Sequence, residues 1–368
     1  MYYYQFQLPQ SLVRSVILFN FLLGNFFFAS VVNAQQPLKF YKPDNPNIQY
    51  VGRIDFSNKR LPRFWQPGVY FSVKFKGDKC EVILNDEELY GKNHNYIEIV
   101  VDGKAYRTQT KSKTDTIKIK GIAGSGLHTL MVCKNTEANI GYLELVGIRC
   151  KKLVKPDPLP KRKIEFIGNS ITCGASADLS EIPCGKGLWQ DQHNAYLAYG
   201  PVAARALQAQ YYLSSVSGIG LVHSCCNLNI TMPEVFDKVS MRDNKIRWDF
   251  KIYQPDIVSI CLGQNDGIQD SSKFCNAYID FVKRLRDYYP GSKFILLSSP
   301  MADDSLRSFL RSTLSSICGE LHRQGEHQVY HYVFEKQYKS GCDSHPDVND
   351  HEQIAKEVAT QIQSVMNW

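Results

Sequence analysis

The sequence of 368 residues lacks any long block of charge of one sign, and its longest basic run is Lys161–Lys163. Its 43 Lys and Arg residues against 36 Asp and Glu residues give a net charge of +7, which is spread along the chain. We therefore expect no dedicated nucleic-acid binder. The sequence also contains no C-x-x-C pair, no H-E-x-x-H motif and no His-x-His cluster, so it offers no support for a zinc site. A hydrophobic content of 43% excludes a disordered, collagenous or coiled-coil protein.

Charge is nearly absent from residues 1–34, where Arg14 is the only charged side chain. The apolar stretch 15–32 follows it, and the small residue Ala34 precedes a polar segment, which is typical of a cleaved secretory signal. An uncleaved membrane anchor is the alternative, because the stretch is close to the minimum length of a spanning helix. The first cysteine is Cys80, which excludes a lipid attached just after the signal. We expect export to a periplasm or out of the cell, with no membrane partner after cleavage.

The 11 cysteines are an odd number, so any set of disulfides within the chain leaves at least one thiol unpaired. Cys173 and Cys184 flank one loop and are candidates for a disulfide in an oxidising compartment. Cys225 and Cys226 are adjacent, and we expect them to serve separately. Most other cysteines are expected to be small buried apolar side chains. The pairing as a whole is left open.

Residues 35–152 have the composition and periodicity of a β-rich domain. Its expected strands include residues 96–101, 104–108, 116–120, 127–133 and 142–150. The dipeptide Asp102-Gly103 separates two of them and suits a type I′ hairpin turn, in which both central residues take positive φ. An antiparallel sandwich is the natural fold for this half. The segment 153–163, which contains Pro156, Pro158 and Pro160, is the predicted linker.

Residues 164–368 alternate short apolar runs with helical patterns. The expected strands cover residues 164–167, 211–216, 256–262, 294–298 and 329–334. The clearest helical stripes are Phe274, Tyr278, Phe281, Val282 and Leu285, and then Ile354, Val358 and Ile362. Alternating strands and helices predict a three-layer α/β domain in which helices cover both faces of a parallel sheet. Such sheets bind ligands at the carboxyl ends of their strands.

Four loops that follow expected strands carry groups suited to acyl transfer. These loops are Gly168-Asn169-Ser170-Ile171-Thr172, Ser217-Gly218-Ile219-Gly220, Gly263-Gln264-Asn265-Asp266 and Asp343-Ser344-His345-Pro346. Ser170 at a strand-to-helix turn has an exposed hydroxyl and a backbone N–H at a helix N-terminus, where positive potential favours an oxyanion. Gly218 and Asn265 can supply further N–H donors. His345 can accept the proton of Ser170, because the imidazole pKa lies near neutrality.

These four blocks, in this order, resemble those of the SGNH hydrolases, also called GDSL esterases and lipases. More narrowly, the stretches 164–174, 248–250 with 254–256, and 341–346 look like carbohydrate esterase family two, and the layout of β-rich half, linker and α/β half matches too. The resemblance implies an all-β jelly-roll sandwich before an SGNH domain with a flavodoxin-like parallel sheet. It also implies a secreted serine esterase that removes acetyl groups from carbohydrates such as xylan or glucomannan and needs no metal or organic cofactor.

Carried over to this chain, the resemblance makes Ser170 the nucleophile and His345 the base. The oxyanion hole would be formed by the Ser170 and Gly218 amides and the Asn265 side chain. Gly220 replaces Gly218 if the glycine loop is registered two residues later. Three further residues are candidate substrate contacts: Gly220, Asp266 and Trp189. Two other aromatic residues, Trp248 and Tyr199, are more typical of a packed core.

The sequence departs from the common SGNH pattern at three positions. Asn169 stands where relatives commonly have Asp. Most SGNH enzymes place an Asp three residues before the histidine, but here that position is Cys342 and the nearest carboxylate is Asp343. Because some group must orient the imidazole of His345, we expect a backbone carbonyl group in preference to Asp343. Ser344 replaces a Trp that relatives often carry, which weakens the case for an extended β-glycan.

The same residues also permit other interpretations. Ser170 on its own would be read as a helix N-cap, a common use of serine at such a turn. The same machinery would also serve another ester, such as an O-acetyl group on peptidoglycan or sialate or a small acyl ester. A catalytically inactive carbohydrate-binding protein is a third possibility. We expect the sandwich to be a structural partner of the catalytic half, and the sugar, the acetyl position and the oligomeric state are not determined by the sequence.

Overall fold

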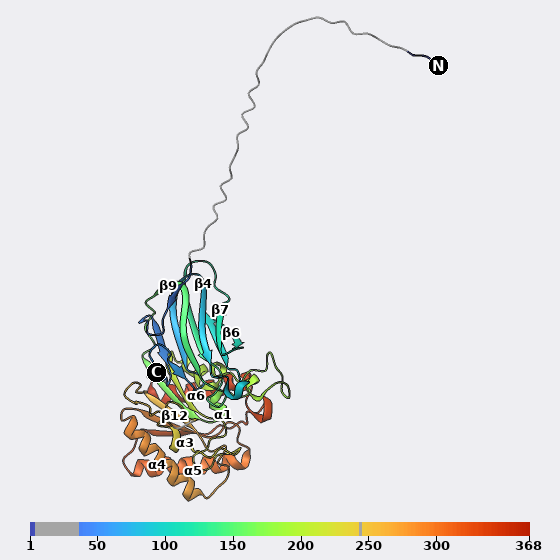
Figure 1. Ribbon diagram of the computed structural model, residues 1–368. Coiled ribbons are helices and arrows are strands. Elements are labelled where there is room, and N and C mark those ends of the chain that lie inside the picture. The colour runs from blue at the N-terminus through green and yellow to red at the C-terminus, as the bar shows by residue number, and fades with distance from the viewer. Residues whose placement is uncertain (4–36, 243–244) are drawn as a thin grey trace. The chain divides into compact units, whose positions relative to one another are not determined.

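The computed structural model describes residues 1–3, 37–242 and 245–368. The predicted signal at 1–34 lies almost entirely outside these residues and stays a prediction. Residues 37–368 form one compact unit (Figure 1). Among the helices that the structure describes, none is both long and apolar enough to cross a membrane.

The first half of the compact unit is built on a nine-stranded, antiparallel sheet A. Its strands are β1 (Lys39–Tyr41), β2 (Ile48–Val51), β3 (Arg63–Phe64), β4 (Tyr70–Asp86), β5 (Tyr96–Val101), β6 (Lys104–Gln109), β7 (Thr114–Lys118), β8 (Leu127–Lys134) and β9 (Leu143–Val154). The main path is β1-β9-β4-β8-β5-β6, with β2 and β7 paired to β4 and β3 paired to β9. A short 3-10 helix, η1 (Leu89–Gly91), precedes β5.

The hairpin between β5 and β6 confirms the turn expected from the sequence. Asp102 and Gly103 have φ values of 48° and 81°, as a type I′ turn requires. The long strand β4 organises the core of this half, because alternate residues such as Phe71, Val73 and Phe75 are fully buried. Each such side chain contributes about 1.5–3 kcal/mol of hydrophobic stabilisation.

Both ends of the predicted linker 153–163 belong to strands. β9 continues to Val154, and β10 begins at Arg162. The lysines near the end of β9 are exposed, so the alternation of apolar residues that marks a half-buried strand is weak there. The segment 155–161 between them contains the three prolines, which cannot donate backbone hydrogen bonds to a sheet.

The second half contains the five-stranded parallel sheet B, as predicted. Its strands are β10 (Arg162–Gly168), β11 (Ala209–Ser215), β12 (Ile257–Cys261), β13 (Lys293–Leu297) and β14 (Val329–Tyr332). They lie in the order β11-β10-β12-β13-β14, and all neighbouring pairs are parallel. This is the flavodoxin-like order, so the carboxyl ends of the strands meet at one edge.

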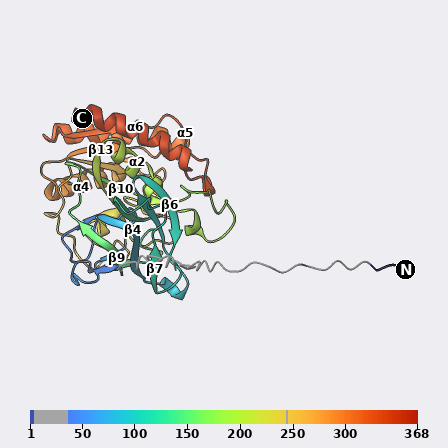
Figure 2. The same ribbon diagram turned by 90° about the horizontal axis from the view of Figure 1, so that it is seen from above.

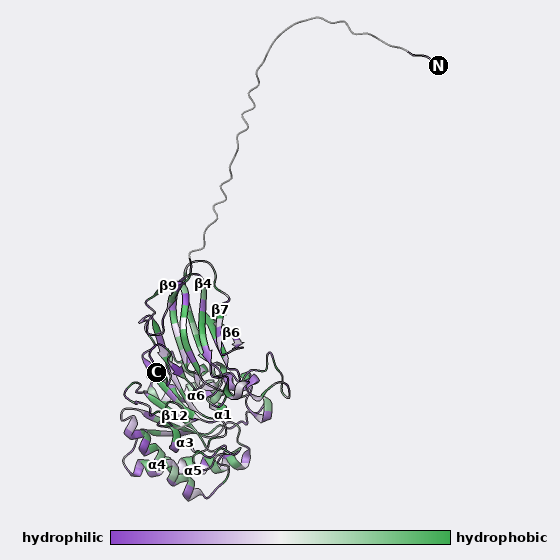
Figure 3. Cartoon of the chain, in the orientation of Figure 1, coloured by the Kyte–Doolittle hydropathy of each residue, from purple (hydrophilic) through white to green (hydrophobic). Residues whose placement is uncertain are grey.

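Helices cover both faces of sheet B. The helices are α1 (Ser170–Cys173), α2 (Tyr199–Ala206), α3 (Met232–Val235), α4 (Ser271–Tyr288), α5 (Asp304–Arg323) and α6 (Val348–Met366), with 3-10 helices η2 (Trp189–Gln192), η3 (Ala195–Leu197) and η4 (Cys342–Ser344). Along β12, Ile257 and Cys261 face the cluster that contains α2 and α6, whereas Val258 and Ile260 face the cluster that contains α4 and α5. In Figure 2, which looks at the unit from above, α5 and α6 appear at the same edge, although they cover opposite faces of sheet B. In Figure 3, α4 and α5 carry many hydrophilic residues.

The two halves share a hydrophobic core. Tyr70 of β4 packs on Tyr211 of β11, with ring centroids 5.3 Å apart. A buried ion pair also joins the halves, since Arg53 Nη2 lies 2.8 Å from Glu165 Oε1. Sheet A is therefore packed against the α/β half in the same compact unit, and the residues between the two sheets are positioned by both.

Candidate active site

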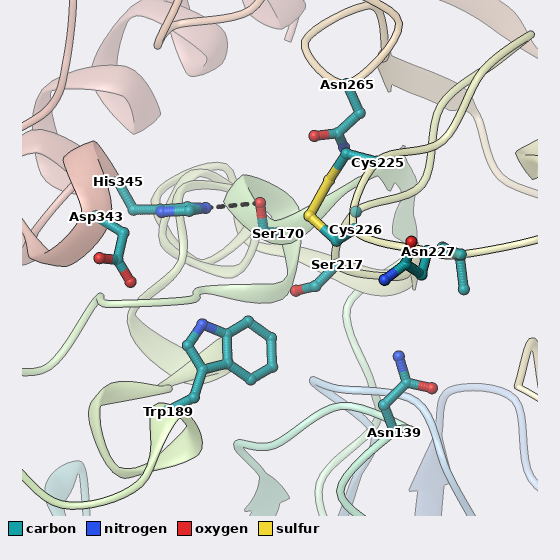
Figure 4. A pocket seen from close by; sticks show the side chains of 12 residues that line it. Asn139, Ser170, Trp189, Ser217, Cys225, Cys226, Asn227, Asn265, Asp343 and His345 are labelled. Carbon is teal, nitrogen blue, oxygen red and sulfur yellow. Dashed lines mark hydrogen bonds between the residues drawn. A yellow bond between two sulfur atoms is a disulfide. The ribbon is translucent and has the colours of Figure 1, made fainter.

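The four predicted loops converge on one cavity of about 490 Å³. The residues that line it are Asn139, Ser170, Trp189, Ser217, Gly218, Cys225, Cys226, Asn227, Leu228, Asn265, Asp343 and His345. Most of them follow strands of sheet B, as expected for the carboxyl edge of a parallel sheet. Figure 4 shows Ser170 and His345 pointing toward each other at the wall of this cavity.

Ser170 is held at a sharp turn between β10 and α1. The N-cap of α1 is Asn169, whose side-chain oxygen accepts a hydrogen bond of 3.1 Å from Ile171 N. Ser170 is thus the first residue of the helix, and its hydroxyl is left for another partner. Gly168 is required at the end of β10, because a Cβ there would lie 2.1 Å from Thr172 Oγ1. Ser170 Oγ lies 2.8 Å from His345 Nε2, which is the geometry of a nucleophile and its base.

His345 follows η4, where two residues adopt left-handed conformations. Asp343 has a φ of 51° and Ser344 a φ of 60°. The turn is closed by hydrogen bonds from His345 N to Cys342 O, at 2.9 Å, and from Gly341 N to His345 O, at 2.7 Å. This turn directs the imidazole back toward the nucleophile.

Burial lowers the pKa of His345, while the backbone carbonyl groups of Cys342 and Asp343 and the charge of Asp343 act in the opposite direction. Within the described residues, no acceptor meets hydrogen-bond geometry with His345 Nδ1. The exposed carboxylate of Asp343 lies at the cavity beside the imidazole (Figure 4). Its role in orienting His345 stays a prediction.

The candidate disulfide between Cys173 and Cys184 does not form. Cys184 pairs instead with Cys342, which is 158 residues away. Cys173 lies in α1, is fully buried, and its Sγ contacts Ser215 Oγ at 3.2 Å. Although both cysteines flank one loop, Cys173 is buried in the core, whereas Cys184 is exposed at the surface. The disulfide that does form ties the loop after the nucleophile to the turn that carries His345.

The candidate oxyanion donors Gly218 and Asn265 line the same cavity as Ser170. Gly218 has a φ of 80° and its carbonyl group accepts a hydrogen bond of 2.8 Å from Cys225 N. Asn265 Nδ2 donates to Ile219 O at 2.8 Å, which uses one of the two N–H groups of the amide.

Gly220 and Asp266 lie outside the cavity lining, as far as the structure describes it. Gly220 N donates to Ser224 Oγ at 3.0 Å. The carboxylate of Asp266 accepts hydrogen bonds from consecutive backbone N–H groups, those of Leu221, Val222 and His223. The geometry thus favours Gly218 over Gly220 as a donor, and it makes Asp266 an organiser of this loop.

Trp189 is the predicted substrate contact that the structure does place at the cavity. Its side chain is 44% exposed, and the ring packs edge-on against His193 with centroids 4.0 Å apart. Asp191 holds this segment through hydrogen bonds from Leu188 N, at 2.6 Å, and from Tyr96 Oη of β5, at 3.0 Å. Trp248 and Tyr199 are buried in the core, as expected.

Sequence reasoning missed six residues of the cavity wall: Asn139, Ser217, Cys225, Cys226, Asn227 and Leu228. Cys225 and Cys226 are joined by a disulfide, so the expectation that they serve separately is wrong. The adjacency of the two cysteines was the signal that could have indicated this bond. Asn139 belongs to the loop between β8 and β9, and nothing in the local sequence links that loop to the other half.

Comparisons with known proteins agree with this architecture. Residues 50–160 match the family described as carbohydrate esterase 2 N-terminal, and residues 164–358 match the GDSL-like lipase/acylhydrolase family. A family two carbohydrate esterase from Clostridium thermocellum, solved in complex with cellohexaose, superposes with a TM-score of 0.80 at 29% identity. The superposition covers 87% of this chain and 99% of that chain.

Two relatives with assigned names are also similar in sequence. The cellulase/esterase CelE of Acetivibrio thermocellus is 30% identical over 342 residues, which cover 88% of this chain and 40% of CelE. An acetylxylan esterase / glucomannan deacetylase of Cellvibrio japonicus is 25% identical over 360 residues, covering 94% of this chain and 98% of the relative. The chain therefore belongs to the GDSL-like lipase/acylhydrolase family and is an ester hydrolase, with the N-terminal domain of carbohydrate esterase 2 before its parallel-sheet half.

Proposed function

We propose that the protein removes O-acetyl groups from a neutral carbohydrate of the acetylated xylan or glucomannan type. The observation that carries this proposal is the 2.8 Å hydrogen bond between Ser170 Oγ and His345 Nε2 at the wall of a cavity that Gly218 and Asn265 also line. The relatives lend support, because they are named acetylxylan esterase and glucomannan deacetylase and one was solved with cellohexaose.

In the acylation step, His345 Nε2 accepts the hydroxyl proton of Ser170 while Oγ attacks the carbonyl carbon of the acetyl ester. The carbonyl oxygen becomes an oxyanion, and the Ser170 and Gly218 backbone N–H groups and the Asn265 amide stabilise it. When this intermediate collapses, His345 gives the proton to the sugar oxygen and the ester C–O bond breaks. The deacetylated sugar leaves and acetyl-Ser170 remains.

In the deacylation step, His345 removes a proton from water, whose oxygen adds to the acetyl carbon. Collapse of the second intermediate returns the proton to Ser170 and releases acetic acid, which ionises. His345 Nδ1 must keep its own proton in both steps. We propose that the backbone carbonyl groups of Cys342 and Asp343 orient the ring, because they favour the protonated imidazole and the Asp343 carboxylate is exposed. Neither carbonyl group meets hydrogen-bond geometry with Nδ1 in this structure, so the contact has to shorten during the reaction.

The charge of the cavity favours a neutral sugar. Among the described residues that line it there is neither Lys nor Arg, and the carboxylate of Asp343 is negative. A sialate ester carries a carboxylate on the acetylated sugar itself, which this lining would repel and could not pair. A neutral acetylated pyranose avoids that cost, and the ring of Trp189 offers it an apolar face.

We propose that the predicted signal at 1–34 directs the protein out of the cytoplasm, to a periplasm or out of the cell. We also propose that the chain is organised as a sandwich domain at 35–152, a linker at 153–163 and a catalytic domain at 164–368. An extracellular location agrees with a polymeric substrate, which does not enter cells intact.

The test is acetate release by the purified protein from acetylated xylan, acetylated glucomannan and 4-nitrophenyl acetate. Ser170→Ala is compared with Ser57→Ala, a matched control on an exposed serine of the first half. We expect acetate from at least one polysaccharide, a loss of kcat of at least about 10³-fold for Ser170→Ala, and no more than a twofold change for the control.

Two results would contradict this proposal in different ways. If the protein cleaves 4-nitrophenyl acetate and an acetylated sialate but neither polysaccharide, the mechanism stands and the proposed substrate is wrong. Binding of polysaccharide by folded protein without any acetate release would favour the carbohydrate-binding alternative.

A further inference from the structure

A residue of the first half holds the loop that carries the proposed oxyanion donor Gly218. Glu137 lies between β8 and β9 and is 1% exposed. Its two carboxylate oxygens accept hydrogen bonds from both donors of Ser217: Oε2 from the backbone N at 2.8 Å, and Oε1 from Oγ at 2.6 Å. The two residues are separated by 80 positions in the sequence and belong to different halves of the molecule.

This contact fixes the peptide bond that contains the Gly218 N–H. Ser217 is held by two hydrogen bonds on one side of that peptide, and on the other side Gly218 O accepts from Cys225 N at 2.8 Å. Gly218 has a φ of 80°, in the left-handed region that favours glycine. The direction of its N–H therefore depends on how Ser217 is held.

The Glu137 backbone is itself fixed by buried contacts. The fully buried Lys134 donates from Nζ to Glu137 O at 3.2 Å and to Thr136 O at 2.6 Å. Asn135 O accepts a hydrogen bond of 3.2 Å from Ala195 N in the second half. Asn139, which follows Asn135 by four positions in the sequence, lines the cavity. The loop 135–142 of the first half is thus held by buried hydrogen bonds and reaches the cavity at Asn139.

A carboxylate at this buried position is energetically unfavourable. Burial raises the pKa of Glu137, and the hydrogen bonds from Ser217 oppose that effect. Its other polar neighbours are more distant: Cys173 Sγ lies at 3.7 Å and His193 Nδ1 at 3.9 Å. Burying a charged group is unfavourable unless the group is well paired. A purely apolar packing residue would fill the same space without that cost.

We propose that Glu137 is a positioning residue for ester hydrolysis, which holds the Ser217–Gly218 peptide so that the Gly218 N–H faces the developing oxyanion. The first half of the molecule is then part of the catalytic machinery, beyond the structural role that we expected for it from the sequence. This inference rests on the proposed function, because it gives Gly218 its role.

The test uses Glu137→Ala, Glu137→Gln and Ser217→Ala in the full chain, with 4-nitrophenyl acetate as substrate. Displacement of one oxyanion donor should lower kcat by about 10- to 100-fold, below the cost of removing a donor outright, and leave KM within about threefold. Glu137→Gln should recover most of kcat, because its amide can accept from Ser217 N and donate to Ser217 Oγ. Ser217→Ala, which keeps the backbone hydrogen bond, should lose about 3- to 10-fold.

Arg53→Lys is the matched control for a loss of stability. Arg53 also joins the halves, through Glu165 and the carbonyl groups of Phe236 and Lys238, and it lies outside the cavity lining. It should lower the unfolding temperature and leave kcat within about twofold. If Glu137→Ala does not fold, Ser217→Ala and Glu137→Gln decide the question.

The proposal is overturned if Glu137→Ala or Ser217→Ala keeps wild-type kcat, or if Arg53→Lys lowers kcat as much at equal loss of stability. An inactive wild-type protein would instead overturn the proposed function, and with it this inference. The two failures are distinguished by the wild-type activity itself.

Discussion

Ser170 and His345 meet in one hydrogen bond, but the regions that hold them are built differently. Ser170 stands at the end of β10, between two neighbouring strands, and its turn is closed by the side chain of Asn169. His345 stands on a short turn with two left-handed residues, and that turn is tied down by the disulfide Cys184–Cys342. Regular secondary structure positions the nucleophile, whereas a cross-link and local hydrogen bonds position the base.

This contrast indicates which parts of the active site can be altered by substitution. The position of Ser170 is set by backbone hydrogen bonds of a buried sheet, so it changes only if the sheet does. The position of His345 depends on an exposed loop that contains Cys184, and on Ser176 Oγ, which donates to Cys342 O at 3.2 Å. We therefore expect substitutions around Ser170 to act on the chemistry or on global stability, and substitutions around the His345 turn to act on the geometry of the base.

The largest expected effect distinguishes the role of the His345 imidazole from that of the neighbouring Asp343 carboxylate. His345→Ala removes the general base and should lower kcat/KM by about 10⁴-fold or more. Asp343→Asn should cost less than about tenfold, because backbone carbonyl groups orient the imidazole in our assignment. Initial rates on 4-nitrophenyl acetate give both numbers. A loss near 10⁴-fold for Asp343→Asn would instead make this carboxylate the third member of a catalytic triad. The base would then be oriented by a side chain and not by the backbone of its turn.

Much of the Ser170 region could be predicted from the sequence, because it depends on local patterns. The five strands of sheet B follow short apolar runs, and side chains at their carboxyl ends must gather at one edge. The order of the blocks along the chain is therefore enough to predict that Ser170, Asn265 and His345 lie close together. The Asp102-Gly103 hairpin was predictable for the same reason, since two adjacent residues determine it.

The supporting contacts of the site could not be predicted, because they join distant segments. Cys184 and Cys342 are 158 residues apart, and their pairing depends on how two loops cross. Glu137 meets Ser217 only because the first half packs against the second. Asp266 looked like a substrate contact in the sequence, yet its carboxylate is used by backbone N–H groups of the neighbouring loop. The local periodicity of the sequence carries no information on such tertiary contacts.

On the nucleophile side, Asn265→Ala should give the second-largest effect. It removes one oxyanion donor and should lower kcat by about 10²- to 10³-fold with a small change in KM. Asn227→Ala, an exposed amide that also lines the cavity, is the matched control and should change kcat by less than about threefold. Similar losses in both variants would mean that Asn265 acts through the shape of the cavity.

On the base side, the double variant Cys184→Ser/Cys342→Ser should loosen the His345 turn. Loss of this cross-link should reduce the free energy of unfolding by about 2–4 kcal/mol. We expect about a tenfold loss of kcat at a temperature where the protein is folded, because Ser170 and His345 are then aligned for a smaller fraction of the time. Urea denaturation and initial rates measure the two effects. Cys275→Ser, at an unpaired cysteine of α4, is the control and should change neither.

The smallest expected effect is a shift in the pH profile of kcat/KM. It tests whether the charge of Asp343 acts on the imidazole of His345 in the same turn. His345 must be neutral to accept the proton of Ser170, so kcat/KM should rise with pH through the imidazole pKa of the free enzyme. Burial lowers the pKa of this group below its ordinary value, and the charge of Asp343 raises it in part. The acidic limb should therefore have its midpoint below about pH 6.5, and Asp343→Asn should move it further down by a fraction of a pH unit, because the neutral amide no longer favours the imidazolium. A midpoint that rises in Asp343→Asn, or that does not move while His345 remains essential, would show that Asp343 does not act on the base through its charge, and the turn would then hold His345 by its backbone alone.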